Sequence, residues 1–261
     1  MIRIAHYKIR VPDRKNRPVR PYSIAVLADL HNEVYGSDPE HLVRAVEMAG
    51  PLAIFSVGDL VLAKFGRCGY GTALGTLRAL ARISPVYAIN GNHETRMRTG
   101  ERYAEAFRAY DEAVRAAGVI MMNNCRRELH FEGMTVSLSG LEPDYEFYKS
   151  FGPRLDAGII REKLGDPGTG YNILLAHHPK YFPAYARWGA DLTLSGHLHG
   201  GIIRLPGIGG IIGPGPDLLP VYDRGRFREG AASMIVSAGL GTHTIKLRLF
   251  NPAELVILDF E

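Results

Sequence analysis

Acidic, amide and imidazole side chains stand near the ends of five apolar segments in this sequence. The segments are residues 23–31, 52–60, 85–93, 172–179 and 191–199, and their Val, Ile, Leu and Ala content is typical of buried strands. The candidate ligands at their carboxyl ends are Asp29, His31, Asp59, Asn92, His93, His177, His178, His197 and His199. This donor set contains no thiolate, which suits divalent Mn, Fe, Co or Zn rather than a structural zinc site. We therefore predict a metal centre built from strand ends.

Two pairs within this set are separated by two residues. Asp29 precedes His31, and His197 precedes His199. In extended backbone, residues i and i+2 point to the same side, so we expect each pair to reach one ion or two adjacent ions. Seven of these residues are plausible ligands, which is more than one ion needs, whereas two ions about 3.5–4 Å apart that share a carboxylate would use all seven. Taken singly, each residue also has a structural interpretation, such as a cap, a turn or a hydrogen-bonded histidine.

Helical periodicity separates several of the strand-like segments. Helices are predicted over residues 37–50, 73–83 and 99–118, and further strands near the N-terminus and over 131–141, 233–240 and 254–260. Such alternation indicates an α/β fold with a largely buried sheet, whose ligands bind at the carboxyl ends of parallel strands. We expect residues 1–261 to form one domain, because the sequence has neither an internal repeat nor a linker-like change of composition.

The overall composition is that of a globular protein. Hydrophobic residues make up 46% of the 261 residues, and no segment approaches the roughly 18 apolar residues of a membrane span. Two cysteines and no signal peptide predict a cytoplasmic location. The net charge of +4 is partly local, because five basic residues gather in one early segment: Arg10, Arg14, Lys15, Arg17 and Arg20. We interpret this segment first as a solvated basic face and second as a contact for acidic lipid or nucleic acid.

Five short motifs occur in order along the chain: DLH at 29–31 within its strand segment, GDL at 58–60, GNHE at 91–94, LLAHHP at 174–179 and GHLH at 196–199. In this order they resemble the signature of the calcineurin-like metallophosphoesterase family. The resemblance implies a layered α/β/β/α sandwich of two mixed sheets flanked by helices. The later part of the chain is similar to a branch of small bacterial phosphodiesterases of the YaeI/YkuE type. Ile202 stands where that branch commonly has glutamine, a departure that bears on substrate choice.

The resemblance also assigns roles to the motif residues. It implies that Asp29, His31 and His199 hold one metal ion. It implies that Asn92, His177 and His197 hold a second. Asp59 would bridge both ions, and Mn is favoured over Fe, Zn or Co. The implied reaction is in-line attack on phosphorus by a hydroxide that the two ions share.

The remaining implied roles concern the reacting groups. Asp59 and His93 are the implied catalytic residues, and Asn92 and His93 the implied substrate-binding residues. His93 would protonate the leaving oxygen or bind the phosphate. His178 is left open between a surface residue and a supporting neighbour of the site.

These features predict a metal-dependent hydrolase of phosphoesters, with a phosphodiester or pyrophosphate favoured over a monoester. The alternatives are a non-catalytic scaffold on the same fold and a nuclease. Nucleic acid is not the expected partner, because few residues remain to grip a polymer. A small phosphoester is expected, and a lipid-linked phosphate with peripheral membrane contact would suit the basic early segment and the apolar loop 205–220. The sequence makes no prediction of oligomeric state.

Overall fold

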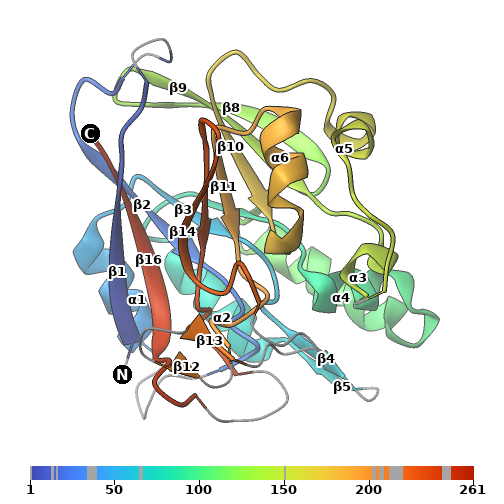
Figure 1. Cartoon of the computed structure of the whole chain (residues 1–261). Helices are drawn as coiled ribbons and strands as arrows, with labels where there is room; N and C mark the ends of the chain where they lie inside the picture. Colours follow the sequence, from blue (N-terminus) through green and yellow to red (C-terminus); the bar gives the residue numbers. More distant parts are fainter. Residues whose placement is uncertain are drawn as a thin grey trace.

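Two six-stranded sheets form the body of the protein (Figure 1). The computed structural model describes residues 2–12, 15, 17–33, 40–64, 67–149, 151–201, 204–205, 209–211, 220–242 and 248–261. The first sheet has the order β1(Ile2–Ile9), β16(Ala253–Phe260), β2(Tyr22–Leu27), β3(Ala53–Ser56), β6(Val86–Ala88), β7(Ile120–Met121). The second has the order β14(Gly225–Glu229), β15(Ala232–Val236), β11(Leu192–Ser195), β10(Tyr171–Ala176), β9(Met134–Leu141), β8(Cys125–Phe131).

Both sheets are mixed. In the first sheet β2, β3, β6 and β7 are parallel neighbours, and β16 pairs antiparallel with β2. In the second sheet β9, β10, β11 and β15 are parallel, and β8 and β14 add antiparallel edges. Two short hairpins, β4(Leu62–Lys64) with β5(Arg67–Gly69) and β12(Arg204–Leu205) with β13(Gly209–Gly210), lie outside the large sheets.

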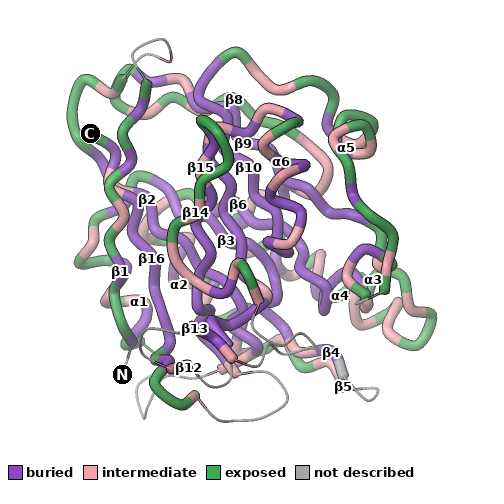
Figure 2. Tube along the Cα trace, in the orientation of Figure 1, coloured by how far each residue is buried: buried purple, intermediate pink, exposed green. Residues whose placement is uncertain are grey.

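Apolar side chains on both faces of the strands produce four layers. Ile24 and Val26 of β2 face a core shared by the two sheets, whereas Ala25 and Leu27 face a second core beneath helices. The helices over the first sheet are α1(His41–Ala49), α2(Gly71–Leu80) and α4(Ala104–Ala116), and those over the second are α5(Ala157–Leu164) and α6(Phe182–Trp188). The strands are buried through much of their length (Figure 2). The predicted α/β/β/α arrangement of two mixed sheets is confirmed.

The element boundaries differ from the sequence prediction at one place that matters for the site. Residues 85–93 were expected to be one strand, but β6 ends at Ala88 and an unpredicted helix, α3(Asn92–Thr99), begins inside the GNHE motif. Gly91 is its N-cap, and the Glu94 carboxylate accepts the Gly91 N–H at 2.9 Å. This capping arrangement stabilises a helix start that apolar periodicity does not reveal.

The other predicted helices are present with shifted bounds. The helix expected over 99–118 is divided into a 3₁₀ turn, Glu101–Tyr103, and α4. The helix expected over 37–50 is α1, and residues 37–39 lie outside the described part of the chain, as do Ile202 and most of the loop 205–220. Among the described residues, every helix is too short or too polar to cross a membrane.

Candidate metal centre

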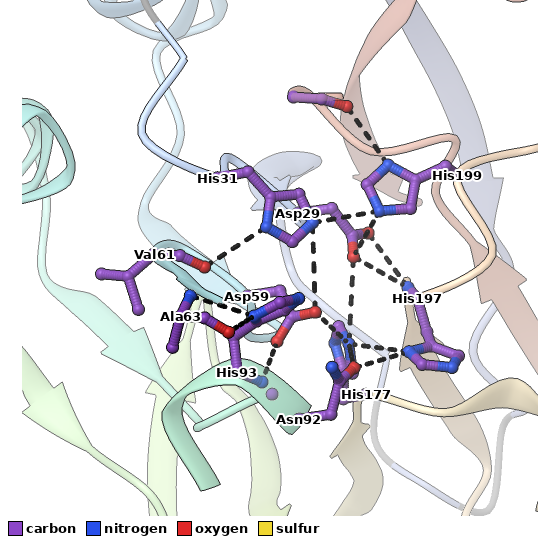
Figure 3. A network of polar contacts seen from close by, with 12 residues as sticks. Asp29, His31, Asp59, Val61, Ala63, Asn92, His93, His177, His197 and His199 are labelled. Carbon is purple, nitrogen blue, oxygen red and sulfur yellow. Dashed lines mark hydrogen bonds and ion pairs between the residues drawn. The ribbon is translucent and has the colours of Figure 1, made fainter. Parts of the chain in front are cut away.

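The predicted donors gather where parallel strands of both sheets end. Asp29 follows β2 and Asp59 follows β3 in the first sheet, while His177 follows β10 and His197 follows β11 in the second. Asn92 and His93 occupy the first turn of α3, which follows β6. Figure 3 shows these side chains pointing toward one another from the two sheets. The expectation that strand ends bring them together is confirmed.

The backbone at the donors is not extended. Five of the donors have positive φ angles of 49–71°: Asp29, His31, Asp59, His197 and His199. The prediction that extended backbone directs residues i and i+2 to the same side is therefore wrong. The paired side chains nevertheless reach the same cluster. Each non-glycine residue in this left-handed region costs about 1–3 kcal/mol, and such strain concentrates at functional sites.

Close packing of the strand-end loops holds this strained backbone. The Asp29 N–H donates to Gly58 O at 3.0 Å, and the His31 N–H donates to Asp59 O at 3.1 Å. A Cβ on Gly58 would lie 2.4 Å from Gly91 N, and one on Gly196 would lie 2.4 Å from an Asp29 carboxylate oxygen. These loops touch backbone to backbone, so the glycines before the donors are required by space.

Asp29, His31 and His199 form one buried group. The Nε2 atoms of His31 and His199 are 3.1 Å apart, and an Asp29 oxygen lies 3.5 Å from His199 Nε2. Each imidazole places its Nδ1 against a backbone carbonyl, His31 against Val61 at 3.3 Å and His199 against Gly241 at 3.2 Å. A neutral ring that donates its Nδ1–H to such a carbonyl presents an Nε2 lone pair to the other ring.

Asn92, His177 and His197 form a second group beside the first. Asn92 Oδ1 lies 3.2 Å from His177 Nε2 and 2.7 Å from His197 Nδ1. The two imidazole nitrogens are 3.3 Å apart. His177 Nδ1 donates to the Val57 carbonyl at 2.7 Å, which directs its Nε2 into the cluster.

Asp59 lies between the two groups. One carboxylate oxygen is 3.2 Å from His177 Nε2 and 4.0 Å from His31 Nε2. The other oxygen accepts the His93 N–H at 2.8 Å. This carboxylate is therefore placed to contact ligands of both groups at once.

The donor set fits divalent cations. Three groups of side chains place one ligand atom each within 4.8 Å of the others: Asp29, His31 and His199; Asp59, His177 and His197; and His31, Asp59 and His93. Lone pairs facing each other at hydrogen-bond distance repel unless a proton or a cation lies between them. A cation coordinated by each group would satisfy these lone pairs, and carboxylate, amide and imidazole donors match borderline and hard divalent ions.

Mutual electrostatics shift the pKa values of the cluster. Burial raises the pKa of Asp29 to about 7, with the Asp59 charge adding to the rise. Burial opposes ionisation of Asp59, but the imidazoles of His177 and His93 outweigh it and hold the Asp59 pKa well below its usual range. Burial also opposes a charge on His177, yet the two aspartates raise the pKa of His177 to about 9. Without a metal the cluster retains a proton at His177, and a metal ion must displace it.

His93 is completely buried at the edge of the cluster. Its Nδ1 lies 3.1 Å from the Ala63 carbonyl, and its ring meets the His31 ring edge-on at a centroid distance of 5.0 Å. Burial lowers the pKa of His93, so the neutral imidazole is favoured. His93 is therefore close to the donors but belongs neither to the group of Asp29, His31 and His199 nor to that of Asn92, His177 and His197.

His178 is a buried neighbour of the cluster rather than a surface residue. Its ring lies 4.1 Å from the His197 ring, centroid to centroid, and packs in parallel with Tyr148 at 6.3 Å. Its carbonyl accepts the Tyr185 hydroxyl at 2.8 Å. His178 is therefore not a surface residue, and its ring packs against that of His197.

Two supporting residues were missed by the sequence analysis. Glu94 accepts the N–H groups of Gly91, Asp59 and Val61 at 2.9–3.1 Å. Its position three residues after a glycine at a helix start was an available signal. The Tyr148 hydroxyl is buried, has no hydrogen-bond partner among the described residues, and belongs to a ring 6.1 Å from that of His177. Tyr148 ends the aromatic run 145–148, which contains no metal-ligand motif and so gave no signal.

Comparison with known proteins agrees with this geometry. A sequence model described as Calcineurin-like phosphoesterase matches residues 22–201. The chain is 26% identical over 249 residues to the uncharacterized metallophosphoesterase YkuE of Bacillus subtilis, covering 92% of this chain and 79% of YkuE. It is also 26% identical to the phosphodiesterase YaeI of Escherichia coli, covering 92% and 82% of the two chains.

Solved structures place the same fold in a larger enzyme. The NAD nucleotidase NadN of Haemophilus influenzae aligns with a TM-score of 0.50 and 13% identity, over 84% of this chain and 51% of NadN. At this identity the similarity concerns the fold alone.

Metal affinity is expected to rise with pH. Below the His177 pKa of about 9, each ion bound at His177 releases one proton, so the Kd should fall about tenfold per pH unit from pH 6 to 8. Competition with a chromophoric chelator measures this dependence, and His130→Gln, which alters an exposed histidine, serves as the matched control. A Kd that does not change with pH would contradict the assignment of His177.

Glu94→Gln is expected to lower the free energy of unfolding by about 1–3 kcal/mol, because one buried N–H then faces an amide NH₂ instead of an acceptor. Urea unfolding monitored by circular dichroism measures the change. Glu105→Gln, on the exposed face of α4, is the control and should unfold like the wild type. Equal stability of both variants would show that the Glu94 carboxylate does not hold these loops.

Proposed function

The chain belongs to the calcineurin-like phosphoesterase family, and from this we propose that it is a phosphodiesterase that works with two divalent metal ions. One ion would be held by Asp29, His31 and His199. The second would be held by Asn92, His177 and His197. Asp59 would contact both. The proposal covers a small phosphodiester or a pyrophosphate as substrate and manganese as the favoured metal.

The position of Asp59 carries the proposal. A single buried carboxylate lies within 3.2 Å and 4.0 Å of imidazoles from two separate donor groups. Two ions joined by such a carboxylate would supply a nucleophilic water at neutral pH and neutralise charge on the phosphoryl oxygens. A single-ion site would leave one donor group with facing lone pairs.

The protein's own residues orient the substrate and move the proton. Asn92 is at the N-terminal turn of α3, where the helix dipole favours an anionic oxygen. His93 is adjacent to Asp59, whose charge favours the protonated imidazole that burial opposes, and in that protonated form it would give a proton to the departing oxygen. Its Nδ1 contact with Ala63 fixes the ring for this transfer.

The preference for a diester rests on the relatives. YaeI is a phosphodiesterase by name and is similar over most of both chains. The scaffold alternative is disfavoured because every motif position of the donor set is filled. The basic segment and the loop 205–220 supported a lipid-linked phosphate as a narrower proposal, and most of that loop is outside the described residues.

Hydrolysis of bis(p-nitrophenyl) phosphate is expected with added Mn²⁺ and should disappear on chelation. Asp59→Asn removes the charge shared by both donor groups and should reduce kcat/KM by at least about 100-fold. Release of nitrophenolate is the measurement, with Asp166→Asn on the exposed surface as the charge-matched control. A fully metal-loaded wild type that is inactive on diesters, pyrophosphates and monoesters alike would overturn the proposed function.

His93→Asn is expected to lower kcat by about 10²–10⁴-fold on substrates with alkyl leaving groups, which need a proton to depart. The loss should be much smaller with p-nitrophenolate, which leaves without one. Metal content measured by atomic absorption should stay at the wild-type value. An equal loss on both classes of leaving group would exclude a proton-donating role for His93.

A further inference from the structure

A basic depression lies at the opposite end of the sandwich from the metal centre. Its volume is about 290 Å³, which is close to the lower limit of small-molecule sites. The lining residues are Lys8, Ile9, Arg10, Tyr171, Leu192, Arg226, Arg228 and Ser233. Tyr171 is the first residue of β10, whereas His177 follows its last residue. Six residues of strand separate them, which is about 20 Å.

The lining has the chemistry of an anion receptor. Four of its side chains carry positive charge, two are hydroxyls and two are aliphatic, and none of these residues is acidic. Arginine and lysine are the side chains that bind phosphate oxygens most strongly, arginine through two parallel N–H groups. The hydroxyls of Tyr171 and Ser233 add two hydrogen-bond donors to this lining.

Nearby acids neutralise only part of this charge. Glu261 lies 3.2 Å from Lys8 Nζ and 3.9 Å from Arg10 Nε. Arg226 and Arg228 form no ion pair with any described residue. Asp191 also lies near Tyr171, but it pairs with Lys15 at 3.3 Å, so the four lining cations still outnumber the acids and the depression is basic.

The two sheets position the cations jointly. Lys8 and Arg10 come from the end of β1 and the segment after it, and Arg226 and Arg228 come from the edge strand β14 of the other sheet. The Arg226 guanidinium donates to the Lys8 carbonyl, which joins the two edges. Buried Ile9 and Leu192 form an apolar floor. The site is thus built by the fold and is more than a run of surface lysines.

The residues of the basic early segment have two different environments, contacts within the fold and the lining of the depression. Lys15 is used inside the fold, where it pairs with Asp191 at 3.3 Å and donates to Gly170 O at 2.9 Å. Arg17 Nε donates to Val11 O at 3.0 Å. Arg10 instead lines the depression. Neither use belongs to the proposed hydrolysis.

We infer that this depression is a second binding site, separate from the metal centre, for a multiply charged phosphate anion. The anion is either a free phosphorylated molecule or the headgroup of an anionic lipid, and the recognition chemistry is the same for both. The aliphatic floor would contact the part of the ligand that carries the phosphate.

Calorimetric titration of the metal-loaded full chain with methylenediphosphonate, a non-hydrolysable probe, tests the free-anion source. With metal kept saturating, two probe molecules per chain are expected, one at the metal centre and one at the depression. The double variant Arg226→Ser/Arg228→Ser should weaken binding of the probe at the depression at least about tenfold. Arg78→Ser/Arg108→Ser removes equal charge from exposed helix faces and should still bind two.

Co-sedimentation with vesicles tests the lipid source. If headgroups occupy the site, cardiolipin vesicles should retain the wild type and the control pair but lose Arg226→Ser/Arg228→Ser, whereas phosphatidylcholine vesicles retain none. Hydrolysis of the nitrophenyl diester should be unchanged in both double variants, which verifies their folding independently of the second site. Tyr171→Phe, which removes one hydroxyl, should weaken binding of the probe at the depression by less than the double variant does. The inference is overturned if the two double variants behave alike in both binding measurements.

Discussion

The contact between Asp59 and imidazoles from two donor groups is the interaction on which the rest of the site depends. His31 comes from the first sheet and His177 from the second, so one carboxylate joins the carboxyl ends of both sheets. Asp59 is only 2% exposed. Burial of its charge is tolerable because the His93 N–H and the neighbouring imidazoles contact the carboxylate. The four-layer sandwich can be understood as the scaffold that brings these two sheet ends to hydrogen-bond distance.

Backbone strain follows from the same requirement. Donors at the ends of parallel strands must turn back toward the other sheet within one or two residues, and left-handed backbone at Asp29, Asp59 and His197 achieves this turn. Glycine is needed where two such turns meet, as at Gly58 against Gly91. The strain is offset by buried N–H bonds to Glu94 and by the hydrophobic cores on both faces of each sheet.

The donor residues and the layered fold could be predicted because chemistry and apolar patterning are local properties of the sequence. The left-handed turns could not, because φ at Asp29 is decided by packing against Gly58, which is distant in sequence. The start of α3 was hidden for a related reason, since a capping carboxylate and not apolar periodicity determines it. Tyr148 and the depression at the opposite end depend wholly on tertiary neighbours, so only the structure reveals them.

Charge explains why the two ends of the molecule are suited to anions in different ways. At the metal centre, Asp29 and Asp59 contribute −2 and two divalent ions would contribute +4, so the loaded centre would carry +1 with a shared hydroxide and attract a phosphodiester monoanion. At the other end, protein cations alone supply the attraction, and exposure to solvent makes that attraction sensitive to salt. A buried centre that depends on ions can perform chemistry on the phosphate, whereas a site of arginine and hydroxyl donors can hold it but has no group positioned to activate water.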